Sequence, residues 1–173
     1  MTRSPAPTLA TAPSPVSRLR RMYHFLLIAA ALLLVASIVG ALVSIEDWSR
    51  DLTTNYAETS DEHADVRLRA ILTKRSAEDV VAAVSECVQE LPRWTWKDGA
   101  PPGDLGSGDS ATLELVRTTR LMRFRDDIVV RIERTEAGTV VNASSRSRVG
   151  KGDLGQNPRN LRELLDKLRA RLS

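Results

Sequence analysis

An uncharged apolar stretch near the N-terminus constrains this chain more than any other feature. Residues 25–45 read FLLIAAALLLVASIVGALVSI, with Ser37 and Ser44 as their polar members. As a helix with a rise of ~1.5 Å per residue, the stretch extends roughly 30 Å, the thickness of a bilayer's hydrocarbon core. A helix also satisfies every backbone hydrogen bond internally, as lipid requires. We therefore expect a single transmembrane helix over residues 23–46.

The charges that flank this stretch predict its orientation. Three arginines precede it, whereas Glu46 and Asp47 follow it. Because basic flanks stay on the cytoplasmic side of a membrane, we expect a cytoplasmic N-terminus. The domain that follows would be held at the inner membrane, in the periplasm or an equivalent exported compartment. The predicted membrane-interface residues are Arg18, Arg20, Arg21, Tyr23 and Trp48.

Two other interpretations fit the same stretch. A cleaved signal peptide would be processed near Gly40 and Ala41, and a buried core helix would lie inside a folded domain. The apolar run is longer than the ~7–15 residues of a signal-peptide core, which favours a retained anchor. An anchor and a signal peptide both export the domain that follows.

Basic charge is concentrated in the N-terminal tail. Residues 1–22 hold four arginines and no acid, and residues 1–17 contain four of the eight prolines. This composition predicts a disordered, basic cytoplasmic tail over residues 1–22. The chain has 25 Lys and Arg against 22 Asp and Glu, so the part from residue 46 onward is close to neutral. We exclude nucleic-acid binding, which needs a dense basic surface.

Cysteine and histidine are too scarce for metal or disulfide chemistry within this chain. The one cysteine is Cys87, and the two histidines are His24 and His63. We expect no metal site, no internal disulfide and no cofactor. Cys87 lies on the apolar stripe of a predicted helix, where nothing would lower the pKa of its thiol. We expect it to be buried and inert.

The chain beyond the apolar stretch has the pattern of one α+β domain. We expect an extended juxtamembrane linker over residues 47–65 and the domain over residues 66–173. Ser76 and Asp79 approximate a capping box that begins a helix, and Pro92 ends it. This helix precedes an antiparallel sheet.

Strands and a final helix complete the predicted domain. Trp94 and Trp96 would point to one face of a short strand, and residues 112–149 alternate as antiparallel strands. Asn157 as N-cap and Pro158 at the first helical position would begin a C-terminal helix. Its apolar stripe, which we expect to pack on the sheet, is Leu161, Leu164, Leu165, Leu168 and Leu172.

The segment over residues 121–133 has one apolar and one charged face. The predicted apolar face consists of Met122, Phe124, Ile128, Val130 and Ile132. Asp126 falls among these positions. Either a bulge at Asp126 and Asp127 shifts the pattern, or the carboxylate of Asp126 is buried with a partner.

The following turn predicts how the charges of two strands pair. If Arg134 pairs with Thr139, counting back along the two antiparallel strands shows which charged residues face each other. The resulting pairs are Asp127 with Arg146 and Arg125 with Arg148. We favour a salt-bridged sheet face over the alternative, a ligand-binding arginine cluster.

A glycine-rich loop lies between the last strand and the last helix. Residues 150–155 match GxGxxG, but a dinucleotide site needs a further strand and an acid about 20 residues on, for which the chain has no room. Either the helix N-terminus holds an anion such as a lipid phosphate, or Asp153 accepts backbone amides in a tight connection. The anion-site residues would be Arg146, Arg148, Gly150, Lys151, Gly152, Asp153, Gly155 and Asn157.

Two segments resemble a known family. Residues 119–133 read TRLMRFRDDIVVRIE and residues 144–164 read SSRSRVGKGDLGQNPRNLREL. They are similar to the hallmark of the domain of unknown function 1499, an aromatic-x-Asp-Asp segment followed by Ser-Arg-Val-Gly-x-x-Asp-x-Gly-x-Asn. The resemblance covers residues 53–172 and implies a module, often tethered or exported, without established catalytic residues. This chain departs from the pattern at Asn160, where members carry Arg, and in lacking an upstream Asn-Cys-Val stretch.

Three functions remain compatible with the sequence. We favour an accessory or assembly subunit that docks on a membrane protein complex, because no catalytic constellation is evident. Small residues on the apolar stretch would permit close helix contact: Ala29, Ala30, Ser37, Gly40 and Ala41. The alternative is binding of a lipid or small amphipathic ligand, with Trp94, Trp96 and the 150–155 loop at the mouth of a cleft. An enzyme that uses Asp126 or Asp127 as base is the least favoured.

Overall fold

The protein consists of two compact units, Met1–Ser44 and Ile45–Ser173. The structure, a computed structural model, describes residues 15–43, 52–101, 110–120 and 122–173. Trp48, one of the predicted interface residues, lies outside these ranges. So does the first part of the predicted linker over residues 47–65.

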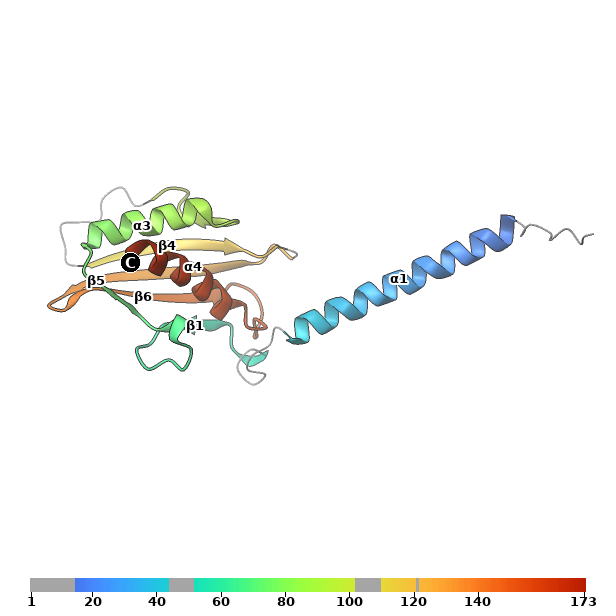
Figure 1. Cartoon of the computed structure of the whole chain (residues 1–173), viewed down its shortest axis with the longest axis horizontal. Coiled ribbons are helices and arrows are strands. Elements are labelled where there is room, and N and C mark those ends of the chain that lie inside the picture. The colour runs from blue at the N-terminus through green and yellow to red at the C-terminus, as the bar shows by residue number, and fades with distance from the viewer. Residues whose placement is uncertain (1–14, 44–51, 102–109, 121) are drawn as a thin grey trace, which may run out of the picture. The chain divides into compact units, whose positions relative to one another are not determined.

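The first unit contains the helix α1, Pro15–Val43 (Figure 1). Within α1, Leu19–Gly40 is long and apolar enough to cross a membrane, with a mean hydropathy of 2.4 and no part buried in the protein. The hydroxyl of Ser37 donates to the carbonyl of Leu33 at 2.8 Å, which satisfies it inside the helix. The predicted apolar helix is confirmed, and its length and composition are sufficient for a membrane anchor or a signal sequence.

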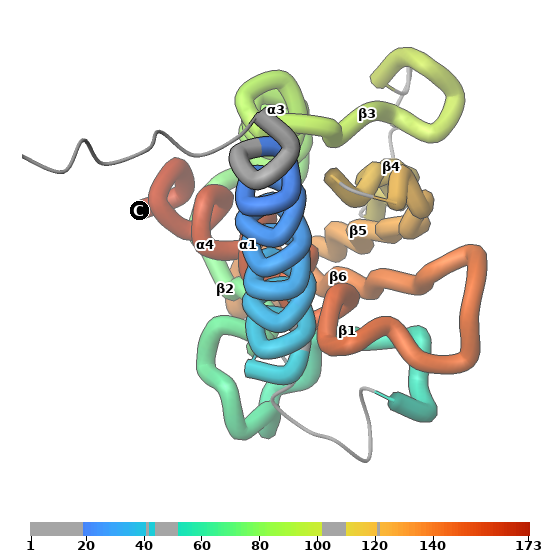
Figure 2. Tube along the Cα trace, turned by 90° about the vertical axis from the view of Figure 1, so that its right-hand side faces the viewer, coloured from blue at the N-terminus to red at the C-terminus, as the bar shows by residue number. Residues whose placement is uncertain are grey.

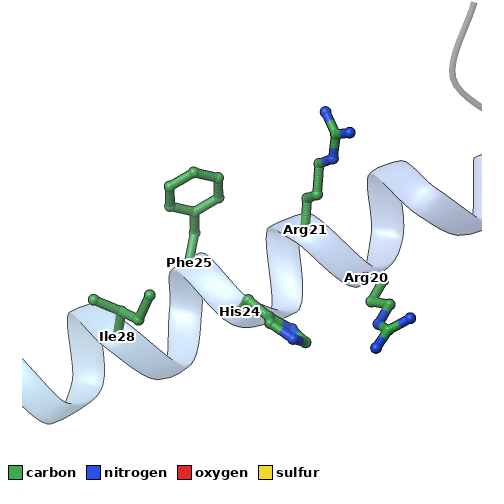
Figure 3. Close-up of a pocket in the computed structure, with 5 residues that line it drawn as sticks. All are labelled: Arg20, Arg21, His24, Phe25 and Ile28. Atoms are coloured by element: carbon green, nitrogen blue, oxygen red, sulfur yellow. The ribbon is translucent and has the colours of Figure 1, made fainter.

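The helix begins earlier than the sequence indicated. Because α1 starts at Pro15, the last part of the tail predicted as disordered over residues 1–22 is helical. Figure 3 shows Arg21 and Phe25 on one side of α1 and Arg20 on another. The hollow among these side chains is lined by α1 alone, so it is an open helix surface and carries no site.

The second unit is built on one six-stranded antiparallel sheet. Its strands are β1 (Tyr56–Glu58), β2 (Ile71–Thr73), β3 (Trp94–Trp96), β4 (Ser110–Thr118), β5 (Arg125–Thr135) and β6 (Gly138–Ser147). Their order is β1-β6-β5-β4-β3, and β2 also pairs with β6. The strand β1 falls inside the predicted linker and pairs with β6 from Tyr56 to Glu58, so the domain begins before the predicted residue 66.

Two helices cover one face of the sheet. They are α3, Ala77–Glu90, and α4, Gln156–Leu172. Figure 2, a view from one end of the domain, shows both helices on the same side of strands β3 to β6. Ser76 and Asp79 form the predicted capping box. Leu113 and Ile128 of the sheet and Leu164 of α4 are fully buried between the layers. The predicted α+β fold, with an antiparallel sheet and a C-terminal helix packed on it, is confirmed. The helix α3 does not precede the whole sheet, however, because β1 and β2 come before it in the chain.

The register of β5 and β6 resolves the position of Asp126. Arg134 pairs with Thr139 and Asp127 pairs with Arg146, as expected, and the pairing continues without interruption to Asp126 and Ser147. No bulge shifts it. Asp126 is 1% exposed, and the second alternative, a buried carboxylate with a partner, is correct.

The apolar face of this segment ends sooner than predicted. Because β5 begins at Arg125, Met122 and Phe124 lie in the preceding turn. They are 64% and 46% exposed. The prediction that they share the buried face was wrong, since the strand alternation that it assumed does not extend into the turn.

The N-terminus of α4 also differs from expectation. Gly155, with φ of 73°, is the N-cap residue and makes no side-chain cap bond. The carboxylate of Asp153 instead accepts the amide hydrogens of Gly155 at 2.9 Å and Asn157 at 2.7 Å. Asn157 is not the cap, because its side chain is fully buried and hydrogen-bonds to serines of the sheet.

Candidate functional site

A pocket of about 500 Å³ lies at one end of the domain, where the sheet meets α4. Figure 1 shows the connection from β4 to β5 and the connection from β6 to α4 at this same end. The pocket is lined by Arg117, Thr119, Arg120, Met122, Phe124, Asp126, Ser147, Val149, Gly150, Gly152, Asp153, Leu154, Gln156 and Arg159. Its size is in the range that accommodates small organic ligands.

The floor of the pocket is a row of three polar residues on adjacent strands. Arg117 of β4 pairs in register with Asp126 of β5, and Asp126 pairs with Ser147 of β6. All three line the pocket. Strand alternation directs them to the face that carries the helices, so cation, carboxylate and hydroxyl lie side by side beneath the opening.

Arg117 and Asp126 do not make all the hydrogen bonds that their side chains can form. The Nε of Arg117 is buried without a hydrogen-bond partner, and the carboxylate of Glu163 lies 3.7 Å from it. The carboxylate of Asp126 accepts one side-chain hydrogen bond, from Asn160 at 2.9 Å. A carboxylate can accept several, so Asp126 keeps capacity to accept from a bound molecule, while Arg117 contributes a cationic side chain to the pocket lining.

A buried network of amides and hydroxyls holds this floor in place. Ser145 donates to the side-chain oxygen of Asn157 at 2.6 Å, and Asn157 donates to the hydroxyl of Ser147 at 3.1 Å. Asn160 donates to Ser145 as well as to Asp126, and it accepts from Gln156 at 2.7 Å. Networks in which every member is paired are rigid, so the floor is preorganised.

The rim of the pocket is apolar and exposed. Met122, Phe124, Val149 and Leu154 are between 43% and 64% exposed, although all are large hydrophobic residues. Leu154 has a φ of 52°, a left-handed conformation that turns the loop. A contiguous exposed apolar patch with polar groups in its centre is typical of a binding site.

Two arginines stand beside this rim. Arg120 is exposed, while Arg159 of α4 is partly buried and donates to the carbonyl of Leu154 at 2.9 Å. The pocket therefore combines an apolar rim and a hydrogen-bonding floor with positive charge at its edge.

The structure divides the predicted anion-site residues between two faces. Gly150, Gly152 and Asp153 line the pocket. The guanidinium of Arg146 instead stacks 4.9 Å from the ring centroid of Tyr56, and Arg148 forms a two-pronged ion pair with Asp127. Among these residues the charged strand face thus carries one salt bridge, which joins Arg148 to Asp127 diagonally rather than directly across.

The amides at the start of α4 are not open to an anion. The carboxylate of Asp153 already accepts the amide hydrogens of Gly155 and Asn157. This is the tight connection that we gave as the alternative. The side chain of Lys151 is exposed. A phosphate would meet the carboxylate of Asp153 at this helix end, so the residues do not assemble an anion site there.

The two tryptophans lie away from this pocket. Trp94 is 4% exposed, belongs to the core, and donates from its indole nitrogen to Glu163 at 3.2 Å. Trp96 borders a separate hollow with Asp98 and Glu114. Neither stands at the mouth that we predicted for them.

The histidine and the cysteine of the folded domain, His63 and Cys87, lie outside the pocket. The Nδ1 of His63 accepts the amide hydrogen of Asp65 at 3.0 Å. Burial raises the pKa of the Cys87 thiol, in agreement with the expected inert cysteine. Within the described ranges, no three His, Cys, Asp or Glu side chains gather in a way that could hold a metal ion.

Sequence reasoning missed Arg117, Asn160 and the turn over residues 119–124 as parts of one site. The available signal was the unusual segment RLMRFR, residues 120–125, in which three arginines are interspersed with bulky apolar residues. We had assigned its apolar members to the core.

The fold and pocket together define a small α+β module with a candidate ligand site at one end of its sheet, preceded by an apolar helix. The chain belongs to the family described as protein of unknown function (DUF1499), whose model matches residues 45–168. The match covers the second unit except its last five residues and leaves out α1. A search of curated proteins finds no match.

Proposed function

We propose that this protein is a membrane-anchored module that binds a lipid or another small amphipathic molecule in the pocket at the end of its sheet. The observation that carries the proposal is the polar row of Arg117, Asp126 and Ser147 beneath an apolar rim. Such a site matches a molecule with one polar and one apolar end.

The energetics support this match. An anionic or accepting group on the ligand would be attracted to the guanidinium of Arg117, which lines the pocket. A donor on the ligand would use the remaining capacity of Asp126. The apolar end would cover Phe124 and Val149, and covering one such side chain contributes roughly 1.5–3 kcal/mol.

We propose binding rather than catalysis at this site. The side chains of Asp126 and Ser147 are engaged by Asn160 and Asn157, which is the arrangement of a structural network. An activated nucleophile would instead need a general base within hydrogen-bond reach.

We further propose that α1 is retained as a transmembrane anchor with a cytoplasmic N-terminus. The support is the length of Leu19–Gly40 together with Arg20 and Arg21 at its N-terminal end. In a bacterial host, alkaline phosphatase fused after Ser173 should be active and green fluorescent protein fused there should be dark. The opposite pattern would contradict the orientation.

The binding proposal is tested by purifying the full chain from membranes in lipid nanodiscs and identifying bound molecules by native mass spectrometry. We expect the wild type to retain an amphipathic molecule. Phe124→Ser and Val149→Ser should each weaken its retention by roughly tenfold or more, because each removes apolar contact at the rim.

Leu72→Ser is the matched control, since Leu72 is also exposed, at 58%, but lies on β2 and does not line the pocket. It should retain the molecule like the wild type. A wild type that emerges empty, or equal loss in the Leu72 variant, would refute the proposal.

Docking on a membrane protein complex is the second candidate. The observation in its favour is that no part of the apolar stretch of α1 is buried, while Ala29, Ala30 and Gly40 would permit close approach of another helix. Blue native electrophoresis in a mild detergent is the test. Migration at the size of one chain alone would count against this candidate.

A further inference from the structure

We infer that the pocket end of the domain docks on the surface of an anionic bilayer, with its two loops inserted at the headgroup level. The turn from β4 to β5 and the connection from β6 to α4 form this docking surface. Its apolar members are Met122, Phe124, Val149 and Leu154. The inference goes beyond ligand binding, because the surface could dock whether or not the pocket is filled.

The first observation is where exposed apolar side chains gather. Met122 and Val149 are 64% and 61% exposed, the largest fractions among the four. All four border one pocket and so lie close together. By contrast, Val66 and Leu72 are exposed singly on η1 (Val66–Leu68) and β2, which is ordinary for a protein surface.

The second observation is the charge around these side chains. Arg120 and Arg123 lie in the turn, Arg125 begins β5, and Lys151 lies in the other loop; all four are exposed. None of the four makes an ion pair with another residue that the structure describes.

The acids that the structure describes at this end do not form ion pairs with those cations. Asp126 is buried, and the carboxylate of Asp153 receives two backbone amides. Asp127 is paired with Arg148. The docking surface is therefore apolar in the centre and cationic around it, a combination that attracts anionic lipid and then inserts into the headgroup region.

The course of the chain favours a bilayer over a soluble partner. Asn55, just before β1, donates to the carbonyl of Gly150 at 2.9 Å. The chain that follows the apolar helix thus enters the domain at the docking surface. A membrane anchor upstream would hold this end of the domain within reach of lipid.

The experiment uses a nitroxide label on the full chain in lipid nanodiscs, where both membrane faces are accessible to reagents. Met122→Cys carries the label, in a Cys87→Ala background so that a single thiol reacts. Nanodiscs of phosphatidylcholine mixed with phosphatidylglycerol are compared with phosphatidylcholine alone. The measurement is collision of the label with a water-soluble nickel chelate and with oxygen.

In anionic nanodiscs we expect the nickel collision rate at Met122→Cys to fall about threefold or more below that of a Leu72→Cys label, while oxygen collisions rise. High ionic strength should reverse the change, because salt screens the attraction. Arg123→Gln with Arg125→Gln should also reverse it. Neither arginine lines the pocket, so ligand retention in that variant separates failure of docking from failure of binding.

Two results would overturn the inference. One is a label at Met122 that stays as accessible to nickel as the label at Leu72 in anionic nanodiscs. The other is equal protection in neutral lipid or in detergent, which would mean that a protein, such as a second copy of this chain, covers the surface instead.

Discussion

A single carboxylate, Asp65, should contribute a pH-dependent part of this domain's stability. Its Oδ1 accepts the amide hydrogen of Arg67 at 3.0 Å, and its Oδ2 accepts from the Nε of Arg162 at 2.7 Å. The first contact caps η1 and the second ties η1 to α4. Although burial acts to raise it, these bonds hold the pKa of Asp65 at about 2, against an ordinary value of 3.8.

The size of the effect follows from this difference in pKa. Each unit corresponds to about 1.4 kcal/mol, so the charged form of Asp65 stabilises the folded state by about 2 kcal/mol. The side chain is 23% exposed, and solvent screening makes this an upper figure. Because the folded pKa is depressed, the stabilisation is complete above the unfolded pKa of 3.8. It is lost as the pH falls toward 2.

The assay is urea unfolding of the full chain in detergent micelles, followed by tryptophan fluorescence, since Trp94 is buried in the core. Asp65→Asn should lower the free energy of unfolding by up to about 2 kcal/mol at pH 7. The difference from the wild type should vanish near pH 2.

The matched control is Asp61→Asn, because Asp61 is exposed on the same connection. It should change the free energy of unfolding by less than about 0.5 kcal/mol at either pH. Equal stability of Asp65→Asn and wild type at pH 7 would refute the reasoning. So would a deficit that persists undiminished at pH 2.

Three further outcomes follow from local geometry. Gly138→Ala should lower the melting temperature by several degrees, because a Cβ there would lie 2.4 Å from the carbonyl oxygen of Thr73 at a φ of 140°; an unchanged temperature in calorimetry would contradict this. Cys87 should react with an aromatic disulfide reagent at pH 8 only when urea unfolds the domain, since burial raises the pKa of its thiol; rapid labelling of the folded chain would disprove it. Ser76→Ala should cost about 1 kcal/mol in urea titrations through loss of the bond to the amide of Asp79, and a loss below a few tenths would not fit.

Local patterns predicted the elements that depend on neighbouring residues. The capping box at Ser76 and the pairing of Arg134 with Thr139 follow from a few adjacent side chains and from turn geometry. The burial of Asp126 was one of two alternatives from the same alternation. The choice between them needed the partner, Asn160, which lies 34 residues away in the chain.

Prediction from sequence failed in the turn before β5, where the polar–apolar alternation of the strand ends. Thr119 accepts the amide hydrogen of Phe124 with its hydroxyl, and its own amide donates to the carbonyl of Phe124 at 2.8 Å. Together with a φ of 54° at Arg123, these bonds close a turn that exposes Met122. Hydrophobicity alone assigned Met122 and Phe124 to the core, because an apolar residue in a turn cannot be distinguished by composition from one in a strand.

The sequence by itself determined the apolar helix, the α+β class and the register of its longest hairpin, since each depends on periodicity or on contacts between near neighbours. Only the tertiary structure decided the candidate site. Arg117, Asp126 and Ser147 come from three different strands, and Asn160 comes from the last helix. Strand pairing and helix packing bring them together, and no local pattern encodes that combination.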